Sequence, residues 1–528
     1  MLDNIADMLL MVGLMAGVFG FPTSFALRYM IPGTAIGVLV GDLLFFVLAV
    51  RLAKRGGGAN VTAMPLGLDT PSTFGMVFFV LGPAYRNALT VYGGDEMAAA
   101  MYTWHLGICA IVVSGIFKLA CAAGSNWIRS TLPRAGLLGS LAAIAAVVIS
   151  FLPLLEVFHS PLVGLVSFAI ILTTLVAKVR LPFHLPGALG ALLVGGSMYW
   201  LIEYGGALAG SPSPAWTNFP EKWLEASDGL FPTEWRRVFS FEWTGALQES
   251  LRYLPVVIPF ALATVVGGID CTESAAVVGD HYDTNQVIAV EALATLAAGL
   301  CGGVIQTTPY IGHPAYKAMG GRAAYTLATA LFVGGAGVLG YFGFLYLLIP
   351  KPTVFPILVF VGLEITAQSF LATPKRHYTA VAIALVPALA ALVKITLDKY
   401  GVNSDYVSRL PDTVAQLDYL TVQMLNAGFI VTSLVWASAL ACLIDRRLLR
   451  AAAFFAVAAV CTLFGIMHSP LPGGALYLPW NLGIDHHQAF APIVYQWAAG
   501  YGLVAAMLTV WGVWLRSTGV GPLEVVDE

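Results

Sequence analysis

The sequence predicts an all-α protein that crosses a membrane many times. Three observations support this fold class: the composition, a series of apolar segments, and a pair of broken segments. Of the 528 residues, 58% are hydrophobic and only 10% are charged, whereas a soluble domain carries roughly 25% charged residues. So few charges cannot cover a water-facing surface, and a net charge of −3 gives no basic surface for nucleic acid. The composition therefore argues against a soluble enzyme, a nucleic-acid-binding protein and a secreted disulfide scaffold.

Apolar segments divide the chain into membrane spans, for which a helix needs about 20 apolar residues. Seven segments lie in the first part of the chain, at 8–29, 32–52, 72–84, 102–122, 135–153, 159–177 and 185–205. After a polar stretch, nine more follow, at 252–278, 285–303, 314–320, 322–349, 353–372, 377–396, 420–444, 451–468 and 491–515. Two of these, 72–84 and 314–320, are too short to span alone.

The loop charges predict the orientation, because Lys and Arg mark cytoplasmic loops. With the N-terminus inside, basic residues fall on alternate connections: Arg51, Lys54, Arg55, Arg129, Arg134, Lys178, Arg180, Arg322, Lys375, Arg376, Arg446, Arg447, Arg450 and Arg516. The N-terminus, MLDNIAD, is acidic and does not resemble a cleavable signal peptide. We therefore expect a multi-pass protein of the cell's inner (plasma) membrane with both termini in the cytoplasm.

The stretch 207–250 is the one sizeable extramembrane element that the sequence predicts. It contains four tryptophans among charged residues, a composition that fits a layer in the outer membrane interface. A lid that captures substrate is one interpretation of this linker. A plain connection between two halves of the chain is the favoured one.

Two stretches, 57–75 and 302–320, share a pattern that is unusual for a membrane span. Each begins with glycines, runs to a proline and a glycine, and then reaches a second proline that opens a short helix. Proline is tolerated at the first position of a helix, so Thr70 and His313 are expected to be the N-caps of two half-helices. Paired interruptions of this kind indicate a transporter's midplane site. Two ordinary proline kinks are the alternative.

Asp270 and Glu273 stand three residues apart in an apolar segment and therefore share a helix face. Even on the gentlest scale, an Asp at the centre of a membrane helix costs roughly 3 kcal/mol. Two carboxylates on one face thus indicate a polar cavity, and their closeness suggests that they exchange a proton near neutral pH. The alternative is a structural pair satisfied by neighbouring hydroxyl or backbone groups.

Asp69 and His313 flank the two predicted half-helix starts. His313 is expected to bind a ligand, to accept a proton or to pair with Asp69, and a backbone carbonyl is its alternative partner. Structural roles are expected for the other embedded acids, Asp42, Glu291 and Glu364. No metal site or cofactor is predicted, because the histidines beside Asp485 are expected to be solvated loop residues.

One run, Thr307 to Arg322 (TTPYIGHPAYKAMGGR), resembles the corresponding stretch of the hypoxanthine/guanine/adenine permeases. These belong to the nucleobase–ascorbate (xanthine/uracil) transporter family. Asp270 followed by Thr272 resembles the family's eighth-helix carboxylate motif. Two later runs resemble its twelfth and fourteenth helices: PTVFPILVFVGLEI (352–365) and LNAGFI (425–430). The resemblance covers roughly residues 8–444.

The resemblance implies an inverted repeat of seven plus seven segments, in which segments 3 and 10 each hold a short strand and a half-helix. It divides the chain into a first repeat (1–206), an outer interfacial linker (207–250), a second repeat (251–444) and two additional helices with a short cytoplasmic tail (445–528). The implied activity is uptake of a nucleobase-like ring, driven by a proton gradient, with sodium not excluded.

The embedded polar residues, taken together with this resemblance, predict the residues of the solute site. Asp270, Glu273 and His313 would couple transport to protons. The solute would be held by the same three residues together with Gly67, Asp69, Thr70, Thr308, Tyr310 and Gly312. One departure matters, because Gly312 stands where the family carries a glutamate that grips the substrate. Its loss removes an acceptor for ring N–H groups, so the solute is expected to be unusual, and an anion becomes an option.

The leading functional hypothesis is a proton-coupled symporter of a nucleobase, purine-like or related small heterocyclic solute, working by alternating access. The alternative is an anion transporter or exchanger with the architecture of the sulfate permeases, since half-helix dipoles favour anions. An enzyme is not expected, because the sequence shows no catalytic motif. The expected partners are the solute, membrane lipid and a second copy in a homodimer.

Overall fold

The computed structural model describes residues 2–57, 60–310, 313–318, 320–402, 404–409, 413–471, 474–481 and 490–518. By its internal contacts the chain forms two compact units. Unit 1 comprises Met1–Asn126 and Ile149–Val361, and unit 2 comprises Trp127–Val148 and Gly362–Glu528.

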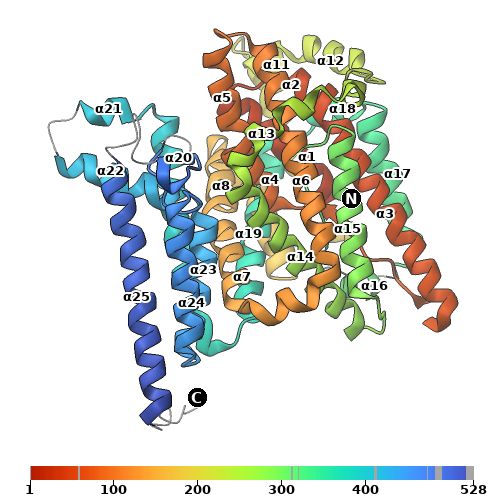
Figure 1. The fold of residues 1–528 in the computed structure, drawn as a ribbon. Coiled ribbons are helices and arrows are strands. Elements are labelled where there is room, and N and C mark those ends of the chain that lie inside the picture. The colour runs from red at the N-terminus through yellow and green to blue at the C-terminus, as the bar shows by residue number, and fades with distance from the viewer. Residues whose placement is uncertain are drawn as a thin grey trace. The chain divides into compact units, whose positions relative to one another are not determined.

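Helices dominate the chain before the linker (Figure 1), and the chain also forms one short strand there. In order they are α1 (Leu2–Phe19), α2 (Thr23–Phe25), α3 (Ile31–Leu52), β1 (Leu66–Leu68), α4 (Thr70–Met76), α5 (Gly82–Val91), α6 (Glu96–Thr131), α7 (Arg134–Ile144), α8 (Phe151–His159), α9 (Pro161–Ile171) and α10 (Gly187–Leu208). The linker holds short helices: α11 (Pro214–Thr217), α12 (Phe219–Asp228), the 3₁₀ turns η8 (Glu234–Ser240) and η9 (Glu242–Ala246), and α13 (Leu247–Ser250).

The chain after the linker repeats this order of elements. It contains α14 (Leu254–Val277), α15 (Thr284–Leu300), β2 (Thr307–Pro309), α16 (His313–Ala318), α17 (Tyr325–Val338), α18 (Phe342–Leu348), α19 (Lys351–Leu371), α20 (Tyr378–Lys399), α21 (Ser404–Ser408), α22 (Thr413–Asn426), α23 (Phe429–Ile444), α24 (Leu448–Leu463) and α25 (Ala491–Thr518). In each half, a strand and a half-helix follow two long helices. The predicted fold class is confirmed: an all-α, polytopic 7+7 arrangement with strands and half-helices in segments 3 and 10, and two additional C-terminal helices.

The helices support a multi-pass membrane protein. Among the described residues, 8 helices are long and apolar enough to cross a membrane, and up to 10 if each of two bent helix pairs is one span. One of the eight runs from Thr70 to Val91, so the prediction that segment 72–84 is too short to span was wrong. The helix continues past Arg86 and Asn87 because both side chains lie on its exposed face.

A stripe of glycines on α3 brings this helix very close to its neighbour α15. Gly33, Gly37 and Gly41 stand four residues apart and so share one helix face. A Cβ added to Gly33 would lie 2.2 Å from the backbone nitrogen of Gly303, and one on Gly37 would lie 2.5 Å from Cβ of Ala298. Small residues at this spacing are typical of closely packed membrane helices. The stripe places the next residue along, Asp42, within reach of β1.

Unit 2 contains the two additional helices, α24 and α25, which pack against each other. A chain of polar contacts fixes α25 to α22 and α23: Trp436 Nε1 donates to Tyr501 Oη (2.8 Å), which contacts His468 Nε2 (2.8 Å), and His468 Nδ1 lies 3.2 Å from the Met424 carbonyl oxygen. Because the Tyr501 oxygen accepts from Trp436, its hydroxyl proton is free to go to His468 Nε2. His468 Nδ1–H then donates to the Met424 carbonyl oxygen, so every donor in this series of contacts has an acceptor.

Candidate functional site

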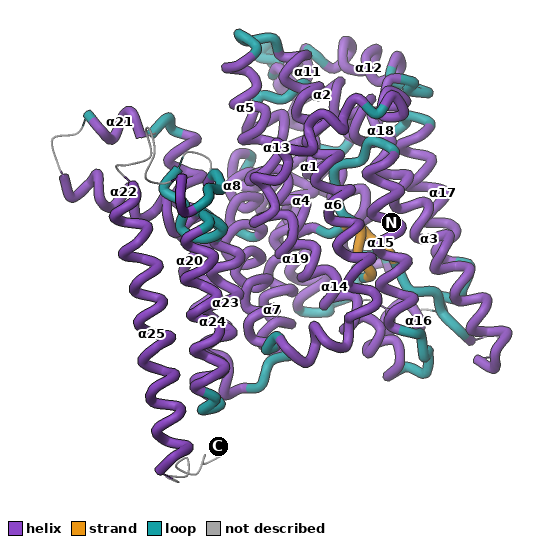
Figure 2. Tube along the Cα trace, viewed as in Figure 1, coloured by secondary structure: helices purple, strands orange, loops and turns teal. Residues whose placement is uncertain are grey.

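The two broken segments meet in an antiparallel strand pair inside unit 1 (Figure 2, orange). The paired residues are Leu66 with Pro309, Gly67 with Thr308 and Leu68 with Thr307. Two more backbone hydrogen bonds extend the ladder, from Asp69 N to Gln306 O (3.0 Å) and from Tyr310 N to Pro65 O (2.8 Å). Since the strands are antiparallel, α4 and α16 leave the pair at opposite ends and run in opposite directions, as an inverted repeat requires. We call this strand pair, with the first turns of α4 and α16, the crossing.

Polar side chains of α1 hold β1 and the start of α4 in place. Asn4 Oδ1 accepts from the backbone N–H of Leu68 (2.8 Å), and Asp7 Oδ2 accepts from the Thr70 hydroxyl (3.1 Å). Both side chains are buried, so they satisfy backbone and hydroxyl groups that no water reaches. Neither residue was predicted from the sequence. Their signal was a pair of polar residues, three apart, on an otherwise apolar helix.

Asp69, not Thr70, is the N-cap of α4. Its backbone is still extended (φ −84°, ψ 104°), and its carboxylate accepts from the N–H of Ser72 at 2.8 Å. The Ser72 and Thr73 hydroxyls donate in turn to the Asp69 carbonyl (3.1 and 2.9 Å). The prediction that Thr70 caps the helix was therefore wrong, since Asp69 still belongs to the strand ladder and the helix begins only after it. The positive end of α4 is thus compensated by a carboxylate of its own chain.

Lys118 and Glu291 form a fully buried ion pair beside β2. Lys118 Nζ, on α6, lies 2.9 Å from Glu291 Oε1, on α15, and both side chains are 0% exposed. The ammonium also donates to the Thr307 carbonyl at 2.8 Å, so it ties β2 to two long helices at once. Lys118 was not predicted from the sequence, although a lysine in the middle of an apolar span is a clear signal of a buried partner.

His313 lies at the start of α16, and its ring is bound to a carboxylate that the sequence analysis did not single out. His313 Nε2 lies 2.9 Å from Asp280 Oδ2, in the connection between α14 and α15, and both side chains are almost fully buried. Asp280 also accepts from Lys317 Nζ (2.7 Å) and from the backbone N–H of Thr62 (3.2 Å). His313 therefore pairs with Asp280 and not with Asp69. The role of this carboxylate is to fix α16 to the chain that leads into β1.

The remaining predicted residues are distributed around the crossing. Helix α14, which carries Asp270, packs against α4, β2 and α16, and Asp270 is half-buried there. Gly67 is buried in β1 and Thr308 is half-buried in β2, while Tyr310 is 37% exposed. Two predicted positions lie outside what the structure describes: Gly312 and the side chain of Glu273.

Two carboxyl groups, Asp42 and Asp69, lie at the crossing. Asp42 Oδ1 accepts from the N–H of Leu66 (3.2 Å), and its other oxygen has no hydrogen-bond partner among the described residues. Neither Asp42 nor Asp69 has an ion pair in the described chain, whereas the nearby lysines, Lys118 and Lys317, are each bound to a carboxylate. The described residues hold no group of three or more His, Cys, Asp or Glu side chains suited to a metal ion. The arrangement can accept a proton or a monovalent cation.

No protein-family model matches the sequence, and no curated protein matches it significantly. Among solved structures, the fold is similar to the transmembrane domain of a cyanobacterium bicarbonate transporter, BicA, at 13% identity and a TM-score of 0.42, covering 83% of this chain and 98% of that one. It is also similar to SLC26A9, at 13% identity and a TM-score of 0.47, covering 76% of this chain and 64% of that one. Both scores indicate a loose likeness that concerns the fold alone.

The predicted membership of the nucleobase–ascorbate family was wrong. The similar structures are named as a bicarbonate transporter, BicA, and as SLC26A9, and no family model supports the resemblance. The physical reason lies in the residues that suggested it. Glycines and prolines around a strand and a half-helix are required by the crossing itself, whatever solute it serves, so they do not distinguish one transporter family from another.

Proposed function

We propose that the chain is a secondary transporter that carries a small anion across the membrane by alternating access, together with a cation. The observation that carries this proposal is the crossing. Non-helical backbone at membrane depth is stable only where it is buried in protein or lines a cavity, and two such segments that meet from opposite halves of a chain are typical of a transporter's solute site.

The chemistry of α16 favours an anion over a nucleobase. The ring N–H groups of a nucleobase need acceptors, and His313 at the start of α16 does not supply one, because its ring is turned toward Asp280, which is itself occupied by Lys317 and Thr62. Thr308 and Tyr310 stay partly exposed near β2, and the hydroxyl of a threonine or tyrosine is a group that can donate to an anion. BicA, one of the similar structures, is named as a transporter of a small anion, bicarbonate.

The carboxylates of the crossing require a cation to accompany the anion. An anion placed near Asp69 and Asp270 meets like charge whenever these carboxyl groups are ionised, and repulsion is strong in a poorly solvated site. A proton or a sodium ion on Asp69, with Asp270 on the adjacent helix α14, removes this repulsion. We therefore assign Asp69 and Asp270 to the coupling cation, and Thr308, Tyr310 and the backbone of the crossing to the anion.

The proposal also includes the predicted membrane, the orientation of the termini, the oligomeric state and the two additional helices. The protein lies in the inner membrane with both termini in the cytoplasm, since the basic loop residues alternate as the predicted orientation requires. It forms a homodimer, and residues 445–528 add two helices outside the repeats.

Uptake into proteoliposomes tests the proposed function. Labelled bicarbonate, sulfate and chloride are supplied outside, with an inward proton gradient, an inward sodium gradient or neither, and labelled hypoxanthine serves as the comparison solute. We expect concentrative uptake of at least one anion under one cation gradient, and no uptake of hypoxanthine. Failure of all three anions to enter above protein-free vesicles would overturn the proposal, as would anion accumulation that is equal with and without both gradients.

A further inference from the structure

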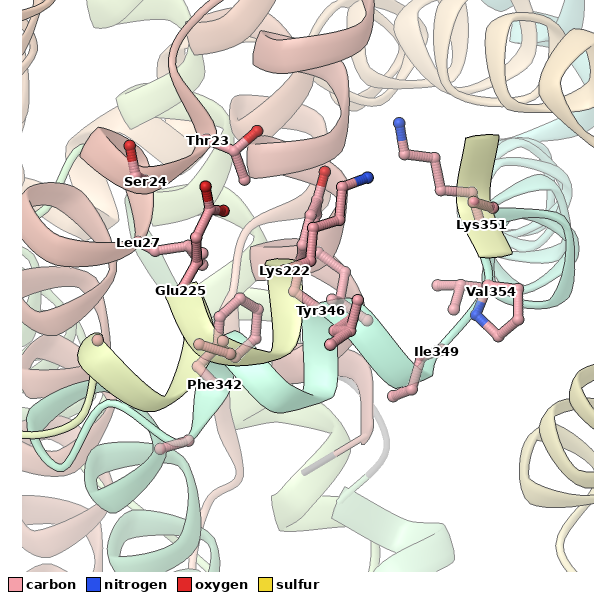
Figure 3. A pocket seen from close by; sticks show the side chains of 18 of the residues that line it. Thr23, Ser24, Leu27, Lys222, Glu225, Phe342, Tyr346, Ile349, Lys351 and Val354 are labelled. Carbon is pink, nitrogen blue, oxygen red and sulfur yellow. The ribbon is translucent and has the colours of Figure 1, made fainter. Parts of the chain in front are cut away.

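The cavity beneath the linker helix α12, in unit 1, is balanced in charge. This space of about 490 Å³ is lined by two lysines, Lys222 and Lys351, and by two glutamates, Glu156 and Glu225. An arginine of its lining is bound to a glutamate of the linker at 3.1 Å. Figure 3 shows Lys222, Lys351 and Glu225 around the same space. The described lining therefore has no excess of either charge with which to select an ion.

Unit 2 contains another space, a groove of about 580 Å³ whose walls are apolar. It lies between α20, α23, α24 and α25. Two polar atoms of its walls, Trp436 Nε1 and Tyr501 Oη, are already bound to each other (2.8 Å). The remaining walls are made by aliphatic and aromatic side chains, chiefly Ile383, Leu440, Leu443, Phe455, Trp497 and Val504. We call this space the apolar groove.

The apolar groove opens toward the hydrocarbon of the membrane. Helix α25 is one of the candidate spans, and 22% of its apolar segment is buried within the protein. Gly500, on the α25 wall of the groove, is exposed, and the nearby Leu503 is 71% exposed. An open apolar space at membrane depth is filled by the acyl chain of a lipid, because neither water nor an ion interacts favourably with its walls.

Three exposed arginines lie at one end of the apolar groove, where α23 turns into α24. They are Arg446, Arg447 and Arg450, and they follow closely on Leu443, which lines the groove. Arg447 and Arg450 both act electrostatically on Cys442, the residue before Leu443, so they lie at this end of α23. In the described part of the chain, the side chains of Arg447 and Arg450 form no hydrogen bond or ion pair.

Among the described residues, the charges of neighbouring elements do not neutralise these arginines. Asp445 is the one acidic residue of the turn, and its carboxylate is already bound to His377 Nε2 (2.8 Å) and to Arg376 (3.2 Å) at the start of α20. Clusters of basic residues at the cytoplasmic end of a membrane helix attract anionic lipid headgroups. The planar guanidinium of arginine also matches the geometry of a phosphate group.

We propose that the apolar groove and the arginines at its end form a binding site for an anionic phospholipid. One acyl chain lies in the groove, and the phosphate of the headgroup binds Arg447 and Arg450. The groove alone would accept the chain of any lipid, and the arginines alone would attract any anion, so their combination determines the ligand. The lipid fills the space between α20, α23 and the two additional helices, and the site is the same whichever solute the protein carries.

Photo-crosslinking in lipid nanodiscs tests this site on the full chain. Nanodiscs of phosphatidylcholine contain a trace of phosphatidylglycerol or phosphatidylcholine with a diazirine on the acyl chain, and the labelled residues are mapped by mass spectrometry. We expect label on the walls of the apolar groove, about tenfold more from phosphatidylglycerol than from phosphatidylcholine. Equal labelling of the groove by the two lipids, or labelling spread evenly over the exposed helices, would overturn the proposal.

Removal of the arginines tests the headgroup contact. Arg447→Gln with Arg450→Gln should abolish the preference, so that both lipids label the groove equally. The matched control is Arg51→Gln with Arg55→Gln, which removes two exposed arginines from α3 and the turn after it in unit 1 and should preserve the preference. A preference that survives the loss of Arg447 and Arg450 would contradict the site.

A larger side chain at Gly500 tests the acyl-chain contact. A Cβ at Gly500 meets nothing within 4 Å, so Gly500→Leu can enter the apolar groove without a clash and should prevent labelling of the groove by both lipids. Gly502→Leu is the matched control: a Cβ there also meets nothing within 4 Å, but Gly502 does not line the groove, and labelling should persist. If Gly500→Leu instead separates a dimer into monomers and lipid never labels the groove, a second copy occupies it and the proposal is wrong.

Discussion

At the scale of single residues, the crossing depends on charges that are buried in pairs. Lys118 holds the Thr307 carbonyl of β2 and the Glu291 carboxylate at the same time. A buried pair is costly to form, because both ions lose their water. The pair contributes by positioning: each ion fixes the other, and together they fix β2, the strand that pairs with β1.

Removal of one member of this pair should therefore lower the free energy of unfolding far more than removal of both. Lys118→Met leaves the Glu291 carboxylate buried and alone, and should lower the free energy of unfolding by about 3–5 kcal/mol. The double variant Lys118→Met, Glu291→Gln should recover most of this loss. The check is denaturant-induced unfolding of the purified protein in detergent. A single variant as stable as the unaltered protein would show that the ion pair is not formed.

The carboxylate of Asp280 should act as a positioning group for α16. It accepts from His313, Lys317 and Thr62, so Asp280→Asn should destabilise the protein more than His313→Gln, which loses one hydrogen bond worth about 1–3 kcal/mol. The double variant should be little worse than Asp280→Asn alone, because both changes remove the same contact. Unfolding measurements give this coupling. A change of solute KM in His313→Gln that Asp280→Asn does not reproduce would instead make His313 a solute ligand.

At the scale of elements, the glycine stripe of α3 determines how closely α15 approaches. Gly33→Ala would place a Cβ 2.2 Å from a backbone nitrogen of the chain after α15, and overpacking of this kind typically costs about 1–3 kcal/mol. Gly502→Ala on α25 is the matched control, since a Cβ there meets nothing within 4 Å, and it should be neutral or stabilising because Ala favours helix. Thermal unfolding of the two variants compares them directly. Equal stabilities would contradict the close packing of α3.

The helices and strands also show which features could be predicted from local sequence. Glycines and prolines marked both broken segments, and the structure pairs them as two strands. The exact start of α4 could not be predicted, because Asp69 and Thr70 are both good capping residues. The decision comes from β2, whose Gln306 carbonyl binds the Asp69 N–H and keeps Asp69 extended. The partner of His313 could not be predicted either, since Asp280 lies 33 residues away in sequence.

At the scale of the whole molecule, the sequence predicted the fold better than the solute. Composition and segment lengths follow from the membrane, so spans and their order could be read directly. The solute depends on which side chains face the crossing, and those contacts join distant parts of the chain, as Asn4 does with Leu68. The position of Lys118 in an apolar span could be read from the sequence, but its counter-ion could not, because Glu291 lies on another helix. The family resemblance failed because it used residues that the architecture requires for any solute.

The central claim, that a cation on the crossing accompanies the anion, is tested most directly by Asp69→Asn in proteoliposomes. Asn is as good an N-cap as Asp, so the variant keeps α4 intact and removes only the charge. Two quantities are measured side by side: exchange of labelled anion at equal concentrations on both sides, and accumulation of the anion driven by the cation gradient. We expect exchange to continue and accumulation to disappear. Accumulation by Asp69→Asn equal to that of the unaltered protein would contradict the claim.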